Sequence, residues 1–509
     1  MDNFNATGGM TLTINIQEAF KTNSAITGWV LSGYALTLGS FIMITGKLAD
    51  IFGPHNVYLC GLFVMWVCAL ICACLPHTSI IPLIVFRALQ GIGASALIPS
   101  TISLTANYFS GSYSKYLNRC IVIMIVVLTS SMGFGLILGG AFSETSIGYR
   151  AFFYFNFAYT FIVDVILLFL IIPINKTEDH KRLHIRQLDF VAAFLVVVGI
   201  LLMILGLIEG GEKWKSAKAI APLIVGFFTF ISAFLYETYY LRRYQLRHQD
   251  KDKSFNWKLQ VQLLFPPELL KIPNFFPFLV VCGLYFGGYT MILVTGIQYY
   301  SFIEHNSPII CALKVFPATF GLIFGASVYR YSYYSKIGLR KMLILSSVLS
   351  LGGAIWFSRI NYNIKSSYWK YNFIALFLYG YGLNMFFNIY LVIVVEHTPL
   401  HLQGVVSGVY QTCSQVLLSI GNALVPSVIG TVDFATTLDE KQGLHEKFRT
   451  VLYIAIAFQA VPVLIFLFCL QNPQRKGEQS EVEVVEIPEK NESLNDLCNQ
   501  SVESDVATV

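Results

Sequence analysis

Thirteen separate stretches of this chain are long and apolar enough to cross a lipid bilayer, and this repetition constrains the fold most. A helix that spans the hydrocarbon core takes about 20 apolar residues. Spanning segments must be helical, because lipid offers no hydrogen-bond partner to an open backbone. The chain is therefore predicted to be an all-α polytopic membrane protein. We place the stretches at 26–45, 57–76, 79–103, 120–142, 151–172, 190–208, 219–240, 275–297, 308–329, 341–358, 372–395, 404–430 and 450–470.

The composition agrees with a membrane protein and excludes other classes. Charged residues make up 12% of the 509 residues and hydrophobic residues 55%, whereas a soluble domain carries about 25% charged residues. A soluble enzyme, a nucleic-acid-binding protein and a disordered scaffold are thereby excluded. The sequence also holds no nucleotide-binding loop, metal-ligand cluster or nucleophile motif, so we predict no enzyme activity, no cofactor and no metal site.

The first twenty residues, 1–20, precede the first complete stretch and are too short and too polar to cross a bilayer alone. They mix Met10, Leu12 and Ile14 with asparagines, threonines and Glu18. This composition is typical of the final turns of a spanning helix, so we predict that the beginning of a first span is missing. A genuine short polar N-terminus is the alternative.

The placement of lysine and arginine predicts the orientation. If the loop after the first complete stretch is cytoplasmic and sidedness alternates, the inner loops hold twenty lysines and arginines and the outer loops eleven. This excess follows the positive-inside rule and places the C-terminus in the cytoplasm. Residues 241–272 then form a basic inner loop in which Trp257 can lie on the lipid headgroups. Residues 471–509 are polar and acidic, and we predict that they are disordered.

The loop after the first complete stretch carries the most informative motif. Gly46 and Gly53 flank it, and glycine lets helix ends approach closely. Asp50 in this loop can bond helix N-terminal amides. It is either an inner gate that locks one state of a transporter or an ordinary helix cap.

A second motif places a charge inside the membrane. Arg87 lies well inside the stretch 79–103 and is followed by Gln90, Gly91 and Gly93. At a helix centre an arginine costs at least about 2.5 kcal/mol, so it normally faces a partner or an aqueous cavity. Two further motifs follow: a small-residue face for close helix packing and a basic residue that opens the next stretch. Their residues are Gly135, Gly139 and Gly140 for the first, and Arg150 for the second.

In this order and at these spacings, the four motifs resemble the signatures of the major facilitator superfamily. The pattern is most similar to the fourteen-span drug:proton antiporter branch, particularly fungal members of the aminotriazole-resistance type. In the second half of the chain, Gln403, Gly404 and Gly408 resemble a further signature of the family. In the family, a pair of basic residues usually ends the first motif, but Pro54 and His55 stand there in this chain. This replacement weakens the case for a gate that depends on an ion pair.

The resemblance implies two six-helix bundles with two additional helices between them. With the truncated first span, the chain would hold about thirteen complete spans. The implied parts are an N-terminal bundle, two additional helices with an inner loop, a basic cytoplasmic loop, a C-terminal bundle and an acidic tail. They cover residues 1–173, 174–240, 241–274, 275–470 and 471–509.

The resemblance also implies export of small, chemically varied toxic compounds, driven by proton entry through alternating access. On this hypothesis Asp50 gates, and Arg87 and Asp164 handle or tune the proton. The expected partners are the lipid bilayer, a small-molecule substrate and protons, with no nucleic acid. We expect a monomer, in the plasma membrane rather than the vacuolar membrane. The alternatives are a transporter of a small inorganic solute, such as ammonium or borate, and a non-transporting membrane receptor.

The remaining charged residues at membrane depth are few. Asp164 is a lone carboxylate inside the stretch 151–172, and its alternative role is that of a neutral, hydrogen-bonded packing residue. Lys314 lies near the outer end of its stretch and is predicted to snorkel to the interface. Glu209 and Glu237 lie at the ends of stretches and are predicted to be solvated.

Substrate contacts are expected from aromatic and neutral polar side chains that line a midplane cavity. Two pairs of amides have i,i+4 spacing, which places both members on one helix face. The alternative is that such amides bond between helices only to satisfy each other. The candidates are Tyr34, Tyr285, Tyr289, Gln298, Asn384, Asn388, Gln411 and Gln415.

Overall fold

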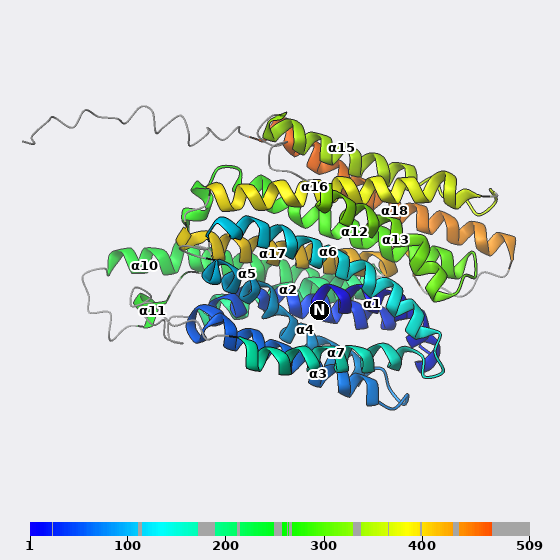
Figure 1. The fold of residues 1–509 in the computed structure, drawn as a ribbon, viewed down its shortest axis with the longest axis horizontal. Coiled ribbons are helices and arrows are strands. Elements are labelled where there is room, and N and C mark those ends of the chain that lie inside the picture. The colour runs from blue at the N-terminus through cyan, green and yellow to red at the C-terminus, as the bar shows by residue number, and fades with distance from the viewer. Residues whose placement is uncertain are drawn as a thin grey trace, which may run out of the picture. The chain divides into compact units, whose positions relative to one another are not determined.

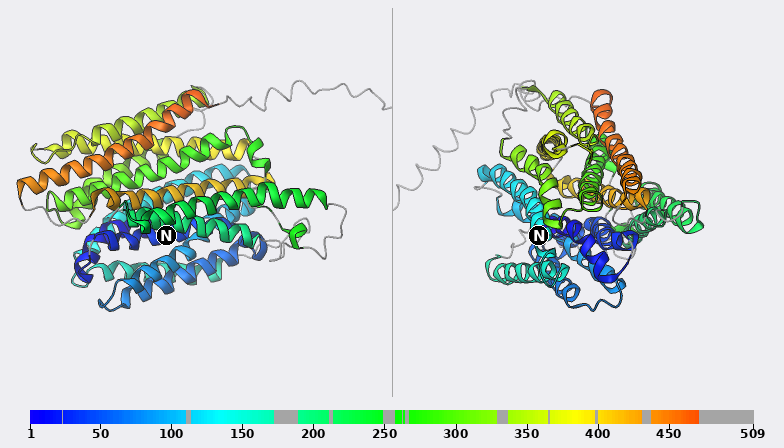
Figure 2. Two further views of the ribbon diagram at one scale, coloured as in Figure 1. Left: turned by 180° about the vertical axis from the view of Figure 1, so that it is seen from behind. Right: turned by 90° about the vertical axis from the view of Figure 1, so that its right-hand side faces the viewer.

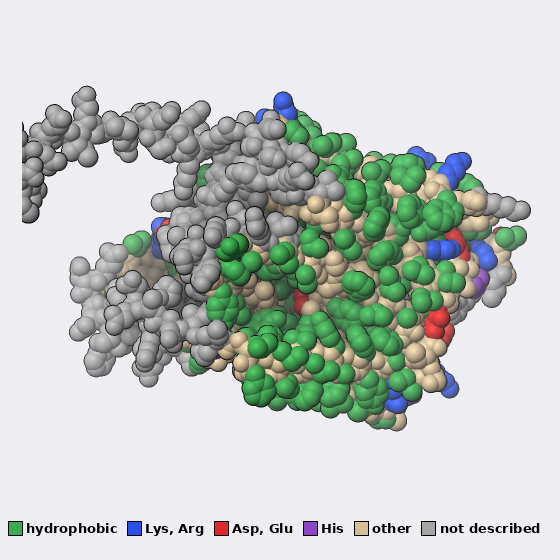
Figure 3. Space-filling view, viewed as in Figure 1, with side chains coloured by type: hydrophobic (Ala, Val, Ile, Leu, Met, Phe, Trp, Pro, Cys, Tyr) green, Lys and Arg blue, Asp and Glu red, His purple; other side chains and the backbone are tan. Residues whose placement is uncertain are grey.

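The computed structural model of the chain describes residues 1–22, 24–109, 114–171, 189–210, 214–248, 257–261, 263, 267–328, 337–364, 366–397, 400–430 and 437–470. In these ranges every regular element is a helix, and thirteen helices are long and apolar enough to cross a membrane (Figure 1). The predicted all-α fold with thirteen complete spans is therefore confirmed. Apolar side chains cover the face seen in Figure 3, and charged side chains gather at its right-hand end.

In its described residues, the N-terminal half has seven helices, and the polar first segment is one of them. They are α1 (Asp2–Phe20), α2 (Ser24–Phe52), α3 (Pro54–Cys74), α4 (Ile81–Ser95), α5 (Leu97–Tyr108), α6 (Ser114–Ser143) and α7 (Tyr149–Leu170). α1 packs against α2 and α6, α4 packs against α2 and α3, and α3 packs against α7. Asn5, Thr7 and Leu12 are buried on α1. The polar residues Asn5 and Thr7 therefore contact other helices.

The predicted stretch 79–103 is two helices, α4 and α5, separated by a turn at Ala96. Proline has no N–H, so Pro99 cannot bond the carbonyl of Ser95 as a continuous helix requires. That carbonyl accepts a hydrogen bond from Thr45 Oγ1 of α2 instead, at 2.8 Å. Hydropathy alone gave one span because both pieces are apolar.

The middle of the chain forms a helical hairpin that continues beyond the predicted span. α8 (Phe190–Gly210) packs against α9 (Ala217–Leu235) and also contacts α2 and α17 (Leu400–Ile429). α9 runs on through the π-helical turn η3 (Tyr236–Leu241) into α10 (Arg242–Arg247). The short helices α11 (Trp257–Gln260) and η4 (Pro267–Lys271) follow.

The described residues of the C-terminal half form the helices α12 (Phe275–Phe302), α13 (Pro308–Val328), α15 (Leu339–Phe357), η5 (Tyr368–Phe373), α16 (Ile374–His397), α17 and α18 (Leu438–Phe468). α12 packs against α17 and α18, α16 packs against α13 and α15, and α15 packs against α18. α18 begins twelve residues before the predicted stretch 450–470. Thr437 and Glu440 form a capping box there, and the first turns are too polar for a prediction from hydropathy to include.

The two halves meet along two helix pairs, α2 with α17 and α6 with α13 (Figures 1 and 2). Glycines permit close approach at both. A methyl group at Gly39 of α2 would lie 2.9 Å from Gln415 Cβ, and one at Gly140 of α6 would lie 2.9 Å from Ile309 Cα. The backbone N–H of Ile309 donates to Glu144 Oε1 at 3.3 Å across the second pair.

The other glycines of the small-residue motif on α6 contact α1. A methyl group at Gly135 would lie 2.4 Å from the carbonyl oxygen of Phe4, and one at Gly139 would lie 2.4 Å from Thr11 Oγ1. Thr7 Oγ1 donates to the Met132 carbonyl at 2.8 Å. α6 therefore holds α1 on one side and α13 of the other half on another.

Candidate functional site

Arg87 on α4 is buried, with 1% of its surface exposed, and three helices supply its hydrogen-bond acceptors. Its Nη1 donates to Asn5 Oδ1 of α1 at 3.0 Å and to Gln90 Oε1 of α4 at 2.8 Å. Its Nε donates to the Val30 carbonyl of α2 at 3.3 Å. Nη2 has no hydrogen-bond partner within the described residues. The guanidinium thus holds α1, α2 and α4 together.

A buried carboxylate contacts the same tyrosine as this guanidinium. Arg87 Cζ is 4.3 Å from the centroid of the Tyr34 ring, within the range of a cation–π contact. The Tyr34 hydroxyl donates to Asp2 Oδ1 at 2.5 Å, and Asp2 is buried. Each charge alone would be costly at this depth. Tyr34 was expected in the substrate cavity, whereas here it links a cation to an anion.

The residues after Arg87 explain the spacing of its motif. Gln90, besides accepting from Arg87, donates through Nε2 to the Met65 carbonyl of α3 at 3.3 Å. A methyl group at Gly91 would lie 2.3 Å from the Tyr34 carbonyl oxygen, so only glycine lets α2 approach here. One at Gly93 would lie 2.9 Å from the Gly61 carbonyl oxygen of α3. The motif therefore packs α4 between α2 and α3 while placing the guanidinium.

Asp164 lies in a different environment. It is buried on α7, and its Oδ2 accepts from Trp66 Nε1 of α3 at 3.0 Å. Its Oδ1 has no hydrogen-bond partner in the part of the chain that the structure describes. No described hydrogen bond joins Asp164 to Arg87, so the two predicted proton-handling residues belong to separate groups.

A narrow cavity of about 20 Å³, enough for roughly one water molecule, lies between the two halves and is partly open to solvent. Four helices line it: α1, α2, α12 and α17. Its side chains are neutral, and five of them carry an amide or a hydroxyl group. Asn422 is buried, and its Oδ1 has no hydrogen-bond partner among the described residues. The lining residues are Thr13, Ile14, Gln17, Thr27, Gly28, Leu31, Val294, Gln298, Phe302, Asn422 and Pro426.

Gln298 is the one predicted substrate contact that lines this described cavity. In the C-terminal half, the Tyr285 hydroxyl donates to Ser347 Oγ at 2.9 Å. Tyr289 stacks on Tyr379, with ring centroids 6.4 Å apart. Both tyrosines are therefore held by neighbouring helices of their own half.

The amide pairs are packed as well. Asn388 Nδ2 donates to Asn384 Oδ1 at 2.5 Å, and both are buried. Gln415 is buried where α17 meets Gly39 of α2, and Gln411 is half-buried. The i,i+4 spacing of Asn384 and Asn388 lets one amide bond the other within α16, whereas the alternative stated from the sequence was a bond between helices. Asn384 Nδ2 has no hydrogen-bond partner among the described residues.

The residues of the loop motifs are described in part. The surroundings of Asp50, Gln403 and Gly404 lie outside what the structure describes. Gly53 has φ +91° and precedes α3, so it needs the conformational freedom of glycine. Arg150 donates to the Leu75 carbonyl at the C-terminal end of α3, where a cation is favourable. A methyl group at Gly46 would lie 3.6 Å from Pro99 Cβ, and Gly408 has open space around it.

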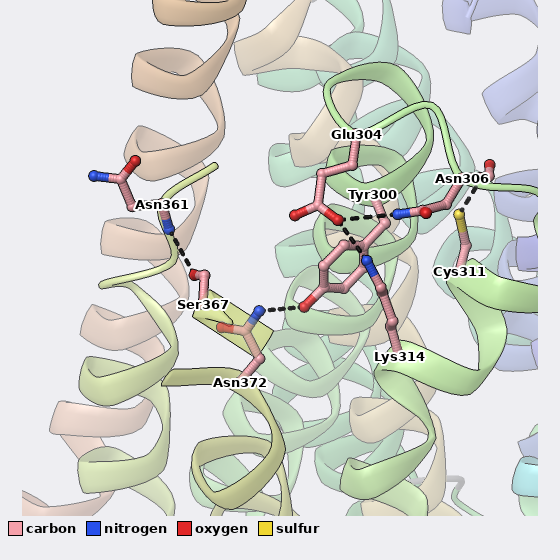
Figure 4. Close-up of polar contacts among 8 residues, drawn as sticks. All are labelled: Tyr300, Glu304, Asn306, Cys311, Lys314, Asn361, Ser367 and Asn372. Atoms are coloured by element: carbon pink, nitrogen blue, oxygen red, sulfur yellow. Dashed lines mark hydrogen bonds and ion pairs between the residues drawn. The ribbon is translucent and has the colours of Figure 1, made fainter. Parts of the chain in front are cut away.

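One prediction about the charged residues, that Glu237 is solvated, needs correction. Lys314 forms an ion pair with Glu304, with Nζ and Oε2 2.5 Å apart, and lies 4.7 Å from the Tyr300 ring centroid (Figure 4). It is therefore paired as well as near the outer end of its helix. Glu237 is fully buried rather than solvated, because its helix continues past it as η3 and α10. Glu209 is half-buried.

Sequence reasoning missed Asp2 and Asn5, the partners that α1 brings to Tyr34 and Arg87. Their i,i+3 spacing on a polar helix was the available signal, because it places both on one helix face. Both partners are distant in the chain: Tyr34 on α2 is 32 residues from Asp2, and Arg87 on α4 is 82 residues from Asn5. No local pattern connects the two.

Comparison with known proteins agrees with the fold. A family model described as Major Facilitator Superfamily matches residues 3–422. An uncharacterized transporter of Saccharomyces cerevisiae is 22% identical over 92% of this chain and 82% of its own length. A multidrug transporter protein of Bacillus subtilis is 23% identical over 79% of this chain and 68% of its own length. The crystal structure of a peptide transporter superposes with a TM-score of 0.58 at 15% identity, covering 91% of each chain.

Proposed function

Because the chain belongs to the major facilitator superfamily and is a multi-pass membrane transporter, we propose that it exports small toxic compounds in exchange for protons across the plasma membrane. The family and these relatives are transporters and not enzymes. The observation that carries the proposal is the buried Arg87, linked through Tyr34 to the Asp2 carboxylate. The Bacillus subtilis relative, which is named a multidrug transporter, supports the substrate class.

In the proposed mechanism, proton binding changes how α1 is held. The ionised Asp2 accepts the Tyr34 hydrogen bond and offsets the charge of Arg87. A protonated carboxyl group no longer offsets that charge, and the contact of α1 with α2 and α4 weakens. α1 also packs against α6, which contacts α13 in the other half. A change at Asp2 is therefore transmitted to a helix pair around which the two halves can rock.

The neutral cavity is the proposed outer part of the substrate pathway. It is lined by the end of α1 and the beginning of α2, which the charge-based orientation puts on the outer side. Asp50, at the other end of α2, remains the proposed inner gate. Asp164 is the second carboxylate, which tunes the response to protons through its contact with Trp66.

The decisive experiment uses the full chain in proteoliposomes with an imposed pH gradient. The panel contains small toxic compounds, ammonium and boric acid. We expect a toxic compound to move against the proton gradient, and an uncoupler to abolish the flux. Flux of ammonium or boric acid alone would support the inorganic-solute alternative. No gradient-dependent flux of any solute, with folded protein in the bilayer, would contradict transport by this mechanism.

The cavity predicts a change in substrate affinity. Gln298→Ala combined with Asn422→Ala removes two amides that line it. A lost hydrogen bond costs about 0.5–1.5 kcal/mol, so we expect KM to rise about tenfold with similar amounts of protein in the membrane. The measurement is initial uptake rate against substrate concentration. Gln411→Ala is the matched control, because Gln411 lies on α17 without lining the cavity. A larger effect of this control would favour a midplane site instead.

Asp164→Asn tests the second carboxylate. The amide keeps an acceptor for Trp66 Nε1 but cannot be ionised. We expect the pH-driven rate to fall about two- to fivefold, corresponding to roughly 0.5–1 kcal/mol. The measurement is uptake rate against external pH, compared with Trp66→Phe, which keeps the carboxyl group and removes the donor. An unchanged rate and pH profile in Asp164→Asn would leave Asp164 a packing residue.

A further inference from the structure

The helix that starts at α9 is longer than a membrane span. It runs from Ala217 to Arg247 through η3 and α10, over 31 residues. At about 1.5 Å per residue this is roughly 46 Å, whereas the hydrocarbon core is about 30 Å thick. Ser216 caps the first end beside Lys215 and Lys218, which suits an interface. The excess length therefore falls at the α10 end.

A stack of aromatic rings runs along this overhanging end. Tyr236, Tyr240, Tyr244 and His248 follow one another at i,i+4 spacing on one helix face. Successive ring centroids are 5.6, 6.5 and 4.4 Å apart, with interplanar angles of 25°, 22° and 29°. Tyrosine and tryptophan rings are enriched at the headgroup level of membranes. The stack therefore marks the depth at which the helix leaves the bilayer.

A lysine from α11 lies over this stack. Lys258 Nζ donates to the Tyr240 hydroxyl at 2.9 Å and is 5.0 and 5.3 Å from the ring centroids of Tyr240 and Tyr244. Gln245 Nε2 donates to the carbonyls of Lys258 and Val261, at 2.9 Å each, and so ties α11 to α10. The hydrogen bond with Tyr240 raises the pKa of Lys258, so this amine is a cation at neutral pH.

The charges and apolar groups of this end are combined in one surface. Arg243 lies 5.2 Å from the Tyr239 ring centroid and is exposed, as is Arg247. Leu246 and Trp257 are exposed beside them. Among the described residues from 236 to 261, Glu237 is the acidic one, and it is buried. The surface thus presents cations and apolar groups together with no exposed described carboxylate.

We propose that this surface, formed by Tyr240, Arg243, Arg247, Trp257 and Lys258, binds the anionic headgroups of phospholipids in the adjacent leaflet. Each lysine or arginine near an anionic membrane surface contributes about 1 kcal/mol, or about a fivefold preference. An acidic protein segment would meet the same cations. Lipid is favoured over such a segment because the exposed apolar groups lie where the helix leaves the bilayer and can enter the headgroup region. This inference does not depend on the transported substrate.

The test uses the full chain in phosphatidylcholine nanodiscs with increasing fractions of phosphatidylserine. Trace dansyl-phosphatidylserine, or dansyl-phosphatidylcholine in a parallel sample, accepts energy from tryptophan. The contribution of Trp257 is the difference in energy transfer between the natural chain and the Trp257→Phe variant, and this difference is the Trp257 signal. We expect more transfer to the serine lipid, saturating as its fraction rises and weakening in high salt. Arg243→Gln and Lys258→Gln should each raise the half-saturating fraction about fivefold.

Arg449→Gln is the matched control. Its guanidinium lies 5.6 Å from the Tyr453 ring centroid at the start of α18, a cation–tyrosine pair at the opposite end of the helices (Figure 1). This variant should leave the Trp257 signal unchanged. Equal transfer to both dansyl lipids, or an unchanged preference in both neutralised variants, would overturn the proposal. Loss of the signal on addition of inorganic phosphate would assign the surface to a free anion. A serine-lipid preference that arises only on removal of residues 471–509 would assign it to the acidic tail.

Discussion

Replacing Arg87 with methionine is expected to lower proton-driven transport at least about 100-fold. Methionine roughly preserves the volume but removes the charge and the donors to Asn5, Gln90 and Val30. Removing one partner of a buried charge pair costs about 3–5 kcal/mol, and each 1.4 kcal/mol is a factor of ten. The measurement is the initial rate of uptake under an imposed pH gradient, normalised to folded protein in the proteoliposomes.

A double-mutant cycle separates the structural role of this arginine from its role in coupling. In Asp2→Asn combined with Arg87→Met, neither charge is left buried alone, so the protein should regain much of the folded yield lost in Arg87→Met. Transport driven by the pH gradient should stay low, because the group that responds to protons is gone. Arg87→Lys keeps the charge without the planar donor set and should be intermediate. Normal gradient-driven rates in the double variant would remove Asp2 and Arg87 from the coupling mechanism.

The membrane spans were predictable because hydrophobicity is a local property of the sequence. The thirteen stretches needed no knowledge of tertiary contacts, and all correspond to observed helices. The helices differ from the predicted stretches in continuity and length where backbone hydrogen bonding or capping decides. At Ala96 a missing N–H of Pro99 interrupts the helix, and before residue 450 a capped polar segment extends it. Neither effect changes the mean hydropathy of the window that predicts a span.

From the sequence, a residue of the site could be identified only where its residue type alone requires a partner at membrane depth. A buried arginine demands partners wherever it lies, so Arg87 could be singled out from the sequence. Its partners could not, because α1 is adjacent to α4 only in the folded chain. The same limit applies to Asn384 and Asn388, whose spacing fits both a cavity and mutual hydrogen bonding. Gln298 and Asn422 come together from α12 and α17, a pairing that no local pattern encodes.

Gly139→Leu is expected to destabilise the folded protein by forcing α1 and α6 apart. The Cβ atom alone would lie 2.4 Å from Thr11 Oγ1 and 2.6 Å from the Gly8 carbonyl oxygen. Because the second atom belongs to the backbone, α1 and α6 must move apart. Overpacking of this kind costs about 1–3 kcal/mol, and sometimes more. We expect the thermal midpoint to fall by roughly 5 °C, measured by fluorescence-detected size exclusion after heating.

Gly352→Ala on α15 is the control for this substitution. Gly352 is also helical, but an added methyl group has no neighbour within 4 Å. Alanine exceeds glycine in helix propensity by about 0.8–1.0 kcal/mol, so the midpoint should stay the same or rise. Since α1 carries Asp2 and Asn5, Gly139→Leu should also weaken coupling in whatever protein remains folded. If it kept both its thermal midpoint and its gradient-driven transport, the close contact between α1 and α6 would not hold the Arg87 group in place.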